Sequence, residues 1–322
     1  MIQHLESLVG QSLMLTFAGS SATPELLDAL AQTRPAGVVL FADNIQNPAG
    51  VHDLIRTLQA EAARLGLPPL LVAVDQEGGI VSRLPEPFTT VPSQMAQAAT
   101  GNSDAAYACA QITARQLRAV GINLNFAPVL DVNCNPANPV IGTRSFSGDP
   151  DVVTRFGLAA LRSYRDAGVI ATVKHFPGHG DTDIDSHLGL PVVRHDLAHL
   201  KQVELAPFAA AVQAGVPAVM SAHVVLEALD EFPATLSAEV LTGLLRCDLG
   251  FDGVVFTDDL TMRAITDRYG LTEATVRAKT AGSDVVLLSV RSLDEQIAVA
   301  RALHEAVASG ALPSTPFEAT AG

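Results

Sequence analysis

Short runs of apolar and β-branched residues recur along this chain, and each is followed by a longer segment in which apolar residues return every three or four positions. The first pattern predicts buried strands, and the second predicts amphipathic helices. The strand pattern occurs at residues 12–17, 36–41, 70–75, 124–131, 169–176, 218–223, 253–259 and 285–290. The clearest helical spacing lies at residues 106–120, 151–167 and 196–214.

Regular alternation of strands and helices predicts an α/β fold with a parallel sheet. Eight repeats match the size of a (β/α)₈ TIM barrel, whereas a doubly wound sheet usually has fewer strands and a glycine-rich turn after the first. No such turn follows residues 12–17. We therefore expect a single (β/α)₈ barrel over residues 1–310, followed by a tail at 311–322 that is frayed.

Composition narrows the function classes. Of 322 residues, 48% are apolar and 17% are charged, and no apolar run approaches the roughly 18 residues of a membrane-spanning helix. The formal charge of -14 disfavours nucleic acid and anionic lipid as partners. The first 17 residues contain Glu6 and no Lys or Arg, unlike a secretory signal. Disulfide and cysteine-metal frameworks are disfavoured by three widely spaced cysteines, Cys109, Cys134 and Cys247. We expect a soluble, monomeric protein of the cytoplasm.

Charged and imidazole side chains stand where the predicted strands end. They are Asp75, Asp131, Lys174, His175, His223, Asp258 and Asp259. In a TIM barrel these ends and the loops after them hold the active site. Helix capping alone would account for Asp131 and Asp259. The set as a whole predicts a functional site at this end of the barrel.

The segment KHFPGHGDTDIDSH, residues 174–187, follows the fifth predicted strand. It contains three histidines and three aspartates, and its glycines at 178 and 180 give the backbone freedom. His175, His179 and Asp181 have side chains that could bind zinc or manganese. Lys174 would then place a cation beside the metal, so we favour a catalytic loop and expect no metal.

Six motifs resemble those of glycoside hydrolase family 3. They are KHFPGHGDTDIDSH, VDQEGG (74–79), NPVIGTRSF (138–146), SAHV (221–224), PATLS (233–237) and GFDGVVFTDDLTM (250–262). The chain is most similar to the single-domain β-N-acetylhexosaminidases that recycle bacterial peptidoglycan. This resemblance implies a retaining glycosidase that removes terminal N-acetylglucosamine (GlcNAc) from muropeptides in the cytoplasm, without a cofactor.

Hydrolysis with retention needs a carboxylate that attacks C1 of the sugar and an acid that protonates the leaving oxygen. The resemblance assigns the first role to Asp258, at the end of the seventh predicted strand. It assigns the second role to His187, with Asp185 as its partner. An imidazole can exchange protons near neutral pH, and a neighbouring carboxylate fixes its tautomer.

The resemblance also implies which residues hold the GlcNAc ring. They are Asp75, Arg83, Arg144, Lys174 and His175. Both arginines could instead be partners in surface salt bridges. One residue departs from the family pattern, because Ile80 stands where arginine is common, which bears on the fine substrate preference.

Three other functions remain open at this stage. A histidine acid does not repel phosphate as a carboxylate would, so a phosphorylase could use the same residues. A metal-dependent hydrolase could use the histidines and aspartates of the 174–187 loop. A barrel that binds sugars without turnover is the third alternative.

Overall fold

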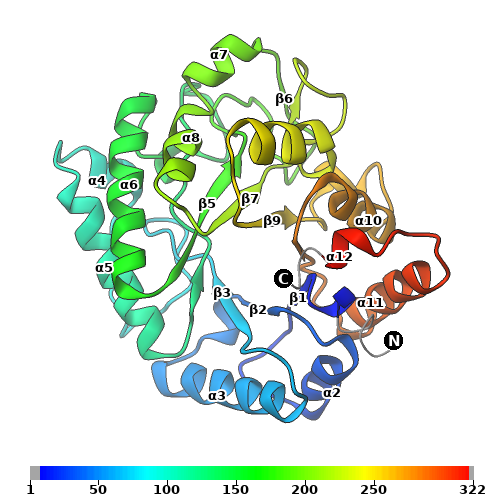
Figure 1. The fold of residues 1–322 in the computed structure, drawn as a ribbon. Helices are drawn as coiled ribbons and strands as arrows, with labels where there is room; N and C mark the ends of the chain where they lie inside the picture. Colours follow the sequence, from blue (N-terminus) through cyan, green and yellow to red (C-terminus); the bar gives the residue numbers. More distant parts are fainter. Residues whose placement is uncertain (1–7, 319–322) are drawn as a thin grey trace.

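The computed structural model describes residues 8–318, while residues 1–7, which include Glu6, and residues 319–322 lie outside the description. Its centre is a closed barrel of eight parallel strands in the order β1-β10-β9-β7-β5-β4-β3-β2, surrounded by helices (Figure 1). The strands are β1 (Leu13–Leu15), β2 (Gly37–Leu40), β3 (Leu71–Val74), β4 (Leu124–Asn125), β5 (Ile170–Phe176), β7 (Ala218–Ser221), β9 (Val254–Asp259) and β10 (Val285–Leu287). Each lies within one of the predicted runs, which confirms the (β/α)₈ TIM barrel.

Helices cover the outside of the barrel. They are α2 (Pro24–Thr33), α3 (Pro48–Arg64), α4 (Gln94–Ala98), α5 (Asp104–Ala119), α6 (Pro150–Ala167), α7 (Leu197–Gln202), α8 (Ala206–Gln213), the π-helix η4 (Glu239–Asp248), α9 (Arg263–Thr266), α10 (Leu271–Ala281), α11 (Leu293–Ala308) and α12 (Thr315–Glu318). Helices α2, α3 and α6 begin with proline after a side chain that caps the first turn, Thr23, Asn47 or Asp149.

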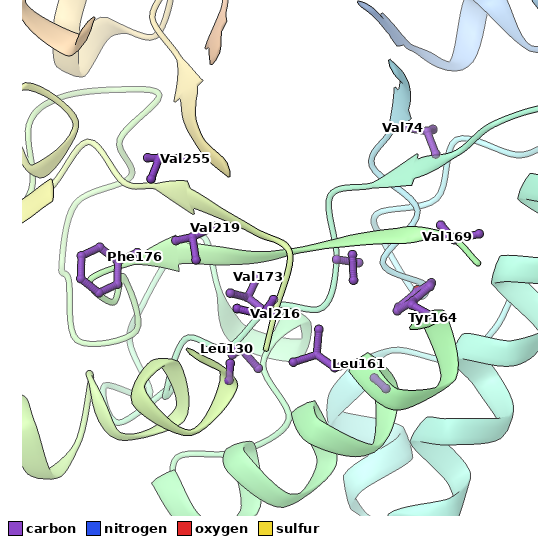
Figure 2. Close-up of a cluster of buried hydrophobic side chains, with 14 of the residues drawn as sticks. Val74, Leu130, Leu161, Tyr164, Val169, Val173, Phe176, Val216, Val219 and Val255 are labelled. Carbon is purple, nitrogen blue, oxygen red and sulfur yellow. The ribbon is translucent and has the colours of Figure 1, made fainter. Parts of the chain in front are cut away.

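Two apolar layers hold these elements together. Inside the barrel, Phe126 and Phe256 pack edge to face with ring centroids 5.6 Å apart. A larger layer fills the space between the strands and the helices. Figure 2 shows part of it, with Val173 and Val219 on the strands and Tyr164 on α6. Burial on both faces explains why the strands read as continuous apolar runs.

Strand β4 is shorter than the predicted run 124–131, although the whole run is buried. Pro128 has no backbone N–H to offer a strand ladder. The side chain of Gln94 accepts from the N–H of Val129 at 3.0 Å and donates to its carbonyl at 2.8 Å. A side chain thus pairs with both backbone groups of Val129, which also forms an isolated parallel bridge with Lys174 of β5.

The predicted helix 196–214 is interrupted between α7 and α8. Pro207 lies in the first turn of α8, where its missing N–H is harmless, but a helix continuing from α7 would clash with its ring. The break buries Glu204. A parallel pair that the sequence did not predict, β6 (Val192–Val193) with β8 (Val225–Leu226), fastens the end of the long loop after β5.

Part of the predicted tail packs on the barrel, because Phe317 in α12 is buried against the apolar cluster of α10 and α11. The predicted fraying stays a prediction for residues 319–322. Throughout residues 8–318, each helix is too short or too polar to cross a lipid bilayer.

Candidate active site

A cavity of about 250 Å³ opens at the C-terminal ends of the strands. Seven of the eight predicted site residues line it: Asp75, Arg83, Arg144, Lys174, His175, His187 and Asp258. The eighth, Asp185, contacts His187. A larger cavity of about 570 Å³ lies near α6 and the N-terminal end of β5, but it is lined by apolar residues and two arginines without a carboxylate or histidine. The polar cavity is therefore the candidate active site.

Buried charges form the floor of this cavity. Lys174 on β5 is 2% exposed, and its Nζ lies 2.6 Å from Asp75 and 2.7 Å from Glu77. Arg144 donates to both carboxylate oxygens of Glu77, at 2.9 and 2.8 Å. Burial would raise the pKa of Glu77, but Lys174 and Arg144 lower it to about 2. The two cations are consequently held in fixed positions.

His175 is held on both sides of its ring. Its Nδ1 lies 2.6 Å from Asp131, and its Nε2 lies 3.2 Å from Nη2 of Arg144. Because a guanidinium only donates, Nε2 must accept and Nδ1 must donate to Asp131. The capping interpretation of Asp131 was wrong, since its buried carboxylate accepts from His175 and from the N–H of His179.

Asp258 lies half-buried near the end of β9. Burial raises the pKa of its carboxyl group, but His223 and His175 oppose this and the net pKa is lowered, so the group is a carboxylate at neutral pH. Asp259 also lines the cavity, but its carboxylate is engaged, because it accepts from Thr261 and from the N–H of Ser289. That arrangement braces the turn after β9, so Asp258 is the better candidate for the attacking group.

The loop after β5 brings His187 to the cavity. Its Nδ1 lies 2.7 Å from Asp185, and its side chain is 62% exposed. Deeper in the loop, the buried ring of His179 contacts Thr182 and Ser186 at 2.7 and 3.0 Å. Burial lowers the pKa of His179 to about 4, so this ring is neutral and supports the loop. Neither His175 nor His179 belongs to a cluster with metal-ligand spacing within residues 8–318.

The two predicted arginines differ in their pairing. Arg144 is bound to a buried carboxylate and is no surface salt-bridge partner. Arg83 lines the cavity, and its Nε is buried without a hydrogen-bond partner among the described residues. A buried, unpaired guanidinium nitrogen is costly unless a ligand supplies the acceptor.

Residues 4–321 match the glycosyl hydrolase family 3 N terminal domain. The chain belongs to glycosyl hydrolase family 3. The resemblance drawn from its motifs is thereby confirmed.

Individual members of family 3 agree with this assignment. Beta-hexosaminidase A of Pseudoalteromonas piscicida is 39% identical in an alignment 317 residues long that covers 88% of this chain and 53% of that protein. The structure of a β-N-acetylglucosaminidase from Paenibacillus sp. str. FPU-7 has 46% identity and a TM-score of 0.96, over 99% of this chain and 61% of that one. This chain therefore spans about half to three-fifths of the length of these two relatives. NagZ from Neisseria gonorrhoeae, solved in complex with N-trifluoroacetyl-D-glucosamine, has 34% identity and a TM-score of 0.80, over 97% of this chain and 96% of that one.

Sequence reasoning missed the roles of two residues in this family 3 site, Glu77 and Asp131. Glu77 stands two positions after Asp75 in a glycine-bounded motif, which was an available signal. Asp131 ends a fully buried run, and a buried carboxylate needs donors nearby. The partners of Glu77 and Asp131, however, lie on other strands and loops, so the sequence alone did not show which side chains they pair with.

Proposed function

We propose that this chain is a retaining exo-β-N-acetylglucosaminidase that removes terminal GlcNAc from muropeptide fragments. One observation carries the proposal: an ionised Asp258 and a His187 paired with Asp185 line the same cavity. These are the two groups that retaining hydrolysis requires. We also propose that the enzyme is a monomer and acts in the cytoplasm.

The first step forms a glycosyl ester. A carboxylate oxygen of Asp258 attacks C1 of the sugar while the bond from C1 to the leaving oxygen breaks. Because Nδ1 of His187 is engaged with Asp185, Nε2 gives its proton to that oxygen. The carboxylate of Asp185 stabilises the imidazolium form from which this proton leaves.

The second step reverses these roles. Nε2 of His187 takes a proton from water as the water oxygen attacks C1. The ester bond breaks, and Asp258 returns to a carboxylate. Two displacements at C1 give a product with the original β configuration.

The remaining polar groups hold the GlcNAc ring. Lys174 and Arg144 are fixed by Glu77, so they can donate to sugar hydroxyls with little reorganisation. Asp75 can accept from a hydroxyl, and Arg83 supplies an N–H donor, at Nε, that has no partner among residues 8–318. Together they would orient C1 toward Asp258.

Product analysis tests this function. A GlcNAc-terminated disaccharide of peptidoglycan is incubated with and without phosphate, and the anomer formed first is identified by ¹H NMR. The account predicts β-GlcNAc in both conditions. An α anomer formed first would contradict retention. Turnover that requires phosphate and yields GlcNAc-1-phosphate would identify a phosphorylase.

Adding a chelator to the same assay tests the alternative of a metal-dependent hydrolase. We expect turnover to continue after chelation, because the proposed groups are organic acids and bases. Activity that disappears with chelator and returns with zinc, while the chelator leaves Tm unchanged, would contradict the mechanism.

A further inference from the structure

A second cluster of titratable side chains lies outside the catalytic cavity. Its members come from the segments after β4, β5 and β6, from α7 and from the break after α7: Cys134, Asp181, His195, His199 and Glu204. None of them lines the cavity that holds Asp258. The proposed reaction uses none of them.

Glu204 is the unusual member of this cluster. Its side chain is 1% exposed, and both carboxylate oxygens are buried without a hydrogen-bond partner among the described residues. It cannot withdraw easily, because Gly178 packs against its stem and a Cβ there would lie 2.8 Å from the Cβ of Glu204. A buried carboxylate without donors is costly, so a cation would relieve it.

Two imidazoles stand beside this carboxylate. The rings of His195 and His199 stack with centroids 3.9 Å apart, and their nitrogens and an oxygen of Glu204 lie within 4.8 Å of one another. Nε2 of His199 lies 3.7 Å from Oε1 of Glu204, which is too long for a hydrogen bond. Ligand atoms around a tetrahedral zinc ion at roughly 2 Å are about 3.3 Å apart. A metal lies in the plane of each imidazole that binds it, so one of the two stacked rings must turn to bring its nitrogen onto the ion.

We propose that His195, His199 and Glu204 bind a divalent cation of the zinc class. Imidazole and carboxylate ligands on a partly buried site favour zinc over calcium or magnesium. Asp181 and Cys134 lie within the same distance of Glu204 and offer a further ligand.

The position of the cation makes its role structural. Asp181 stands in the loop that carries Asp185 and His187, whereas His199 stands on α7. With Asp181 as the further ligand, the metal would tie this loop to the outer helix layer. It does not touch the cavity, which distinguishes this site from that of a metal-dependent hydrolase.

Ion pairs alone are the simpler interpretation of the cluster. His195 contacts Asp181 at 2.7 Å and needs no metal for that contact. This interpretation leaves both oxygens of Glu204 without a donor, and it gives no reason for three ligand atoms to converge. The two interpretations make different predictions for zinc binding.

The test is zinc binding by the full chain after chelator treatment and desalting. We expect one zinc ion per chain by calorimetry and by elemental analysis after gel filtration, with a rise in Tm on adding zinc. Glu204→Gln and His199→Ala should each lower the affinity at least tenfold. His52→Ala, which changes an exposed histidine elsewhere, should bind like the parent chain.

Stability of the metal-free variants separates binding from folding. Glu204→Gln keeps the volume and removes an unpartnered charge, so its metal-free Tm should equal or exceed that of the parent. If this variant fails to fold, His199→Ala carries the test, because its side chain is 42% exposed. Zinc that binds equally to the parent, His199→Ala and His52→Ala, or does not bind the parent at all, would overturn the proposal.

Discussion

Replacing Glu77 by glutamine tests whether buried charge pairing holds the floor of the site. Glutamine preserves the volume but removes the negative charge that Lys174 and Arg144 share. Its amide also presents two N–H donors where the carboxylate presented only acceptors. One of the two cations then loses its partner while it stays buried.

The size of the effect follows from the pKa of Glu77. A pKa lowered from 4.5 to about 2 corresponds to roughly 3 kcal/mol of stability at neutral pH. Breaking a buried ion pair costs about 3–5 kcal/mol, in agreement. Because the folded pKa is depressed, this stability is present above pH 4.5 and is lost as the pH falls toward 2. The Glu77→Gln variant lacks this carboxyl group, so its stability should not show this dependence on pH.

Urea unfolding at pH 7 and at several pH values below 4.5 measures both features. We expect a deficit of about 3 kcal/mol at pH 7 that narrows in acid. Glu273→Gln is the matched control, because its partner Arg277 is exposed, and it should change stability by less than about 0.5 kcal/mol. Equal effects of the two substitutions, or a deficit that does not depend on pH, would refute the reasoning.

Three further predictions concern catalysis. His187→Ala should slow substrates with poor leaving groups by about 100-fold or more and leave activated aryl glycosides much less affected, because a good leaving group needs no proton; equal losses in kcat would contradict the acid role. Arg83→Met should lower kcat/KM by about 10–100-fold, because a charged hydrogen bond to the substrate is lost. The free energy of unfolding should change by less than about 0.5 kcal/mol, because Nε of Arg83 has no hydrogen-bond partner among the described residues. Because the pKa of Asp258 is lowered, the rate of ester formation from an activated substrate should hold as the pH falls through the ordinary carboxyl range near 4 and decline only below it; a decline that begins above pH 5 would assign the nucleophile elsewhere.

The barrel was predictable because its strands are buried on both faces. Such strands appear as isolated apolar runs, and the polar residue after each run marks the catalytic end. Asp75, Lys174 and Asp258 were found in this way. Local exceptions were hidden, since the backbone of Val129, beyond the end of β4, bonds to the side chain of Gln94, 35 residues earlier in the chain.

Pairing between side chains was harder to predict than position. The sequence placed Lys174 and Arg144 at the site, but not Glu77 between them, because each comes from a different strand or loop. Asp131 has the residue type and spacing of a cap, and only the fold turns it toward His175. The convergence of His195 with Glu204 likewise depends on the helix break at Pro207, which the helical spacing of 196–214 concealed.

Trapping of the covalent intermediate tests the central claim most directly. The enzyme is incubated with a 2-fluoro sugar that forms the ester quickly and releases it slowly, then digested and sequenced by mass spectrometry. The account predicts one labelled peptide, with the sugar on Asp258. A label on any other residue, or continued turnover without any label, would contradict it.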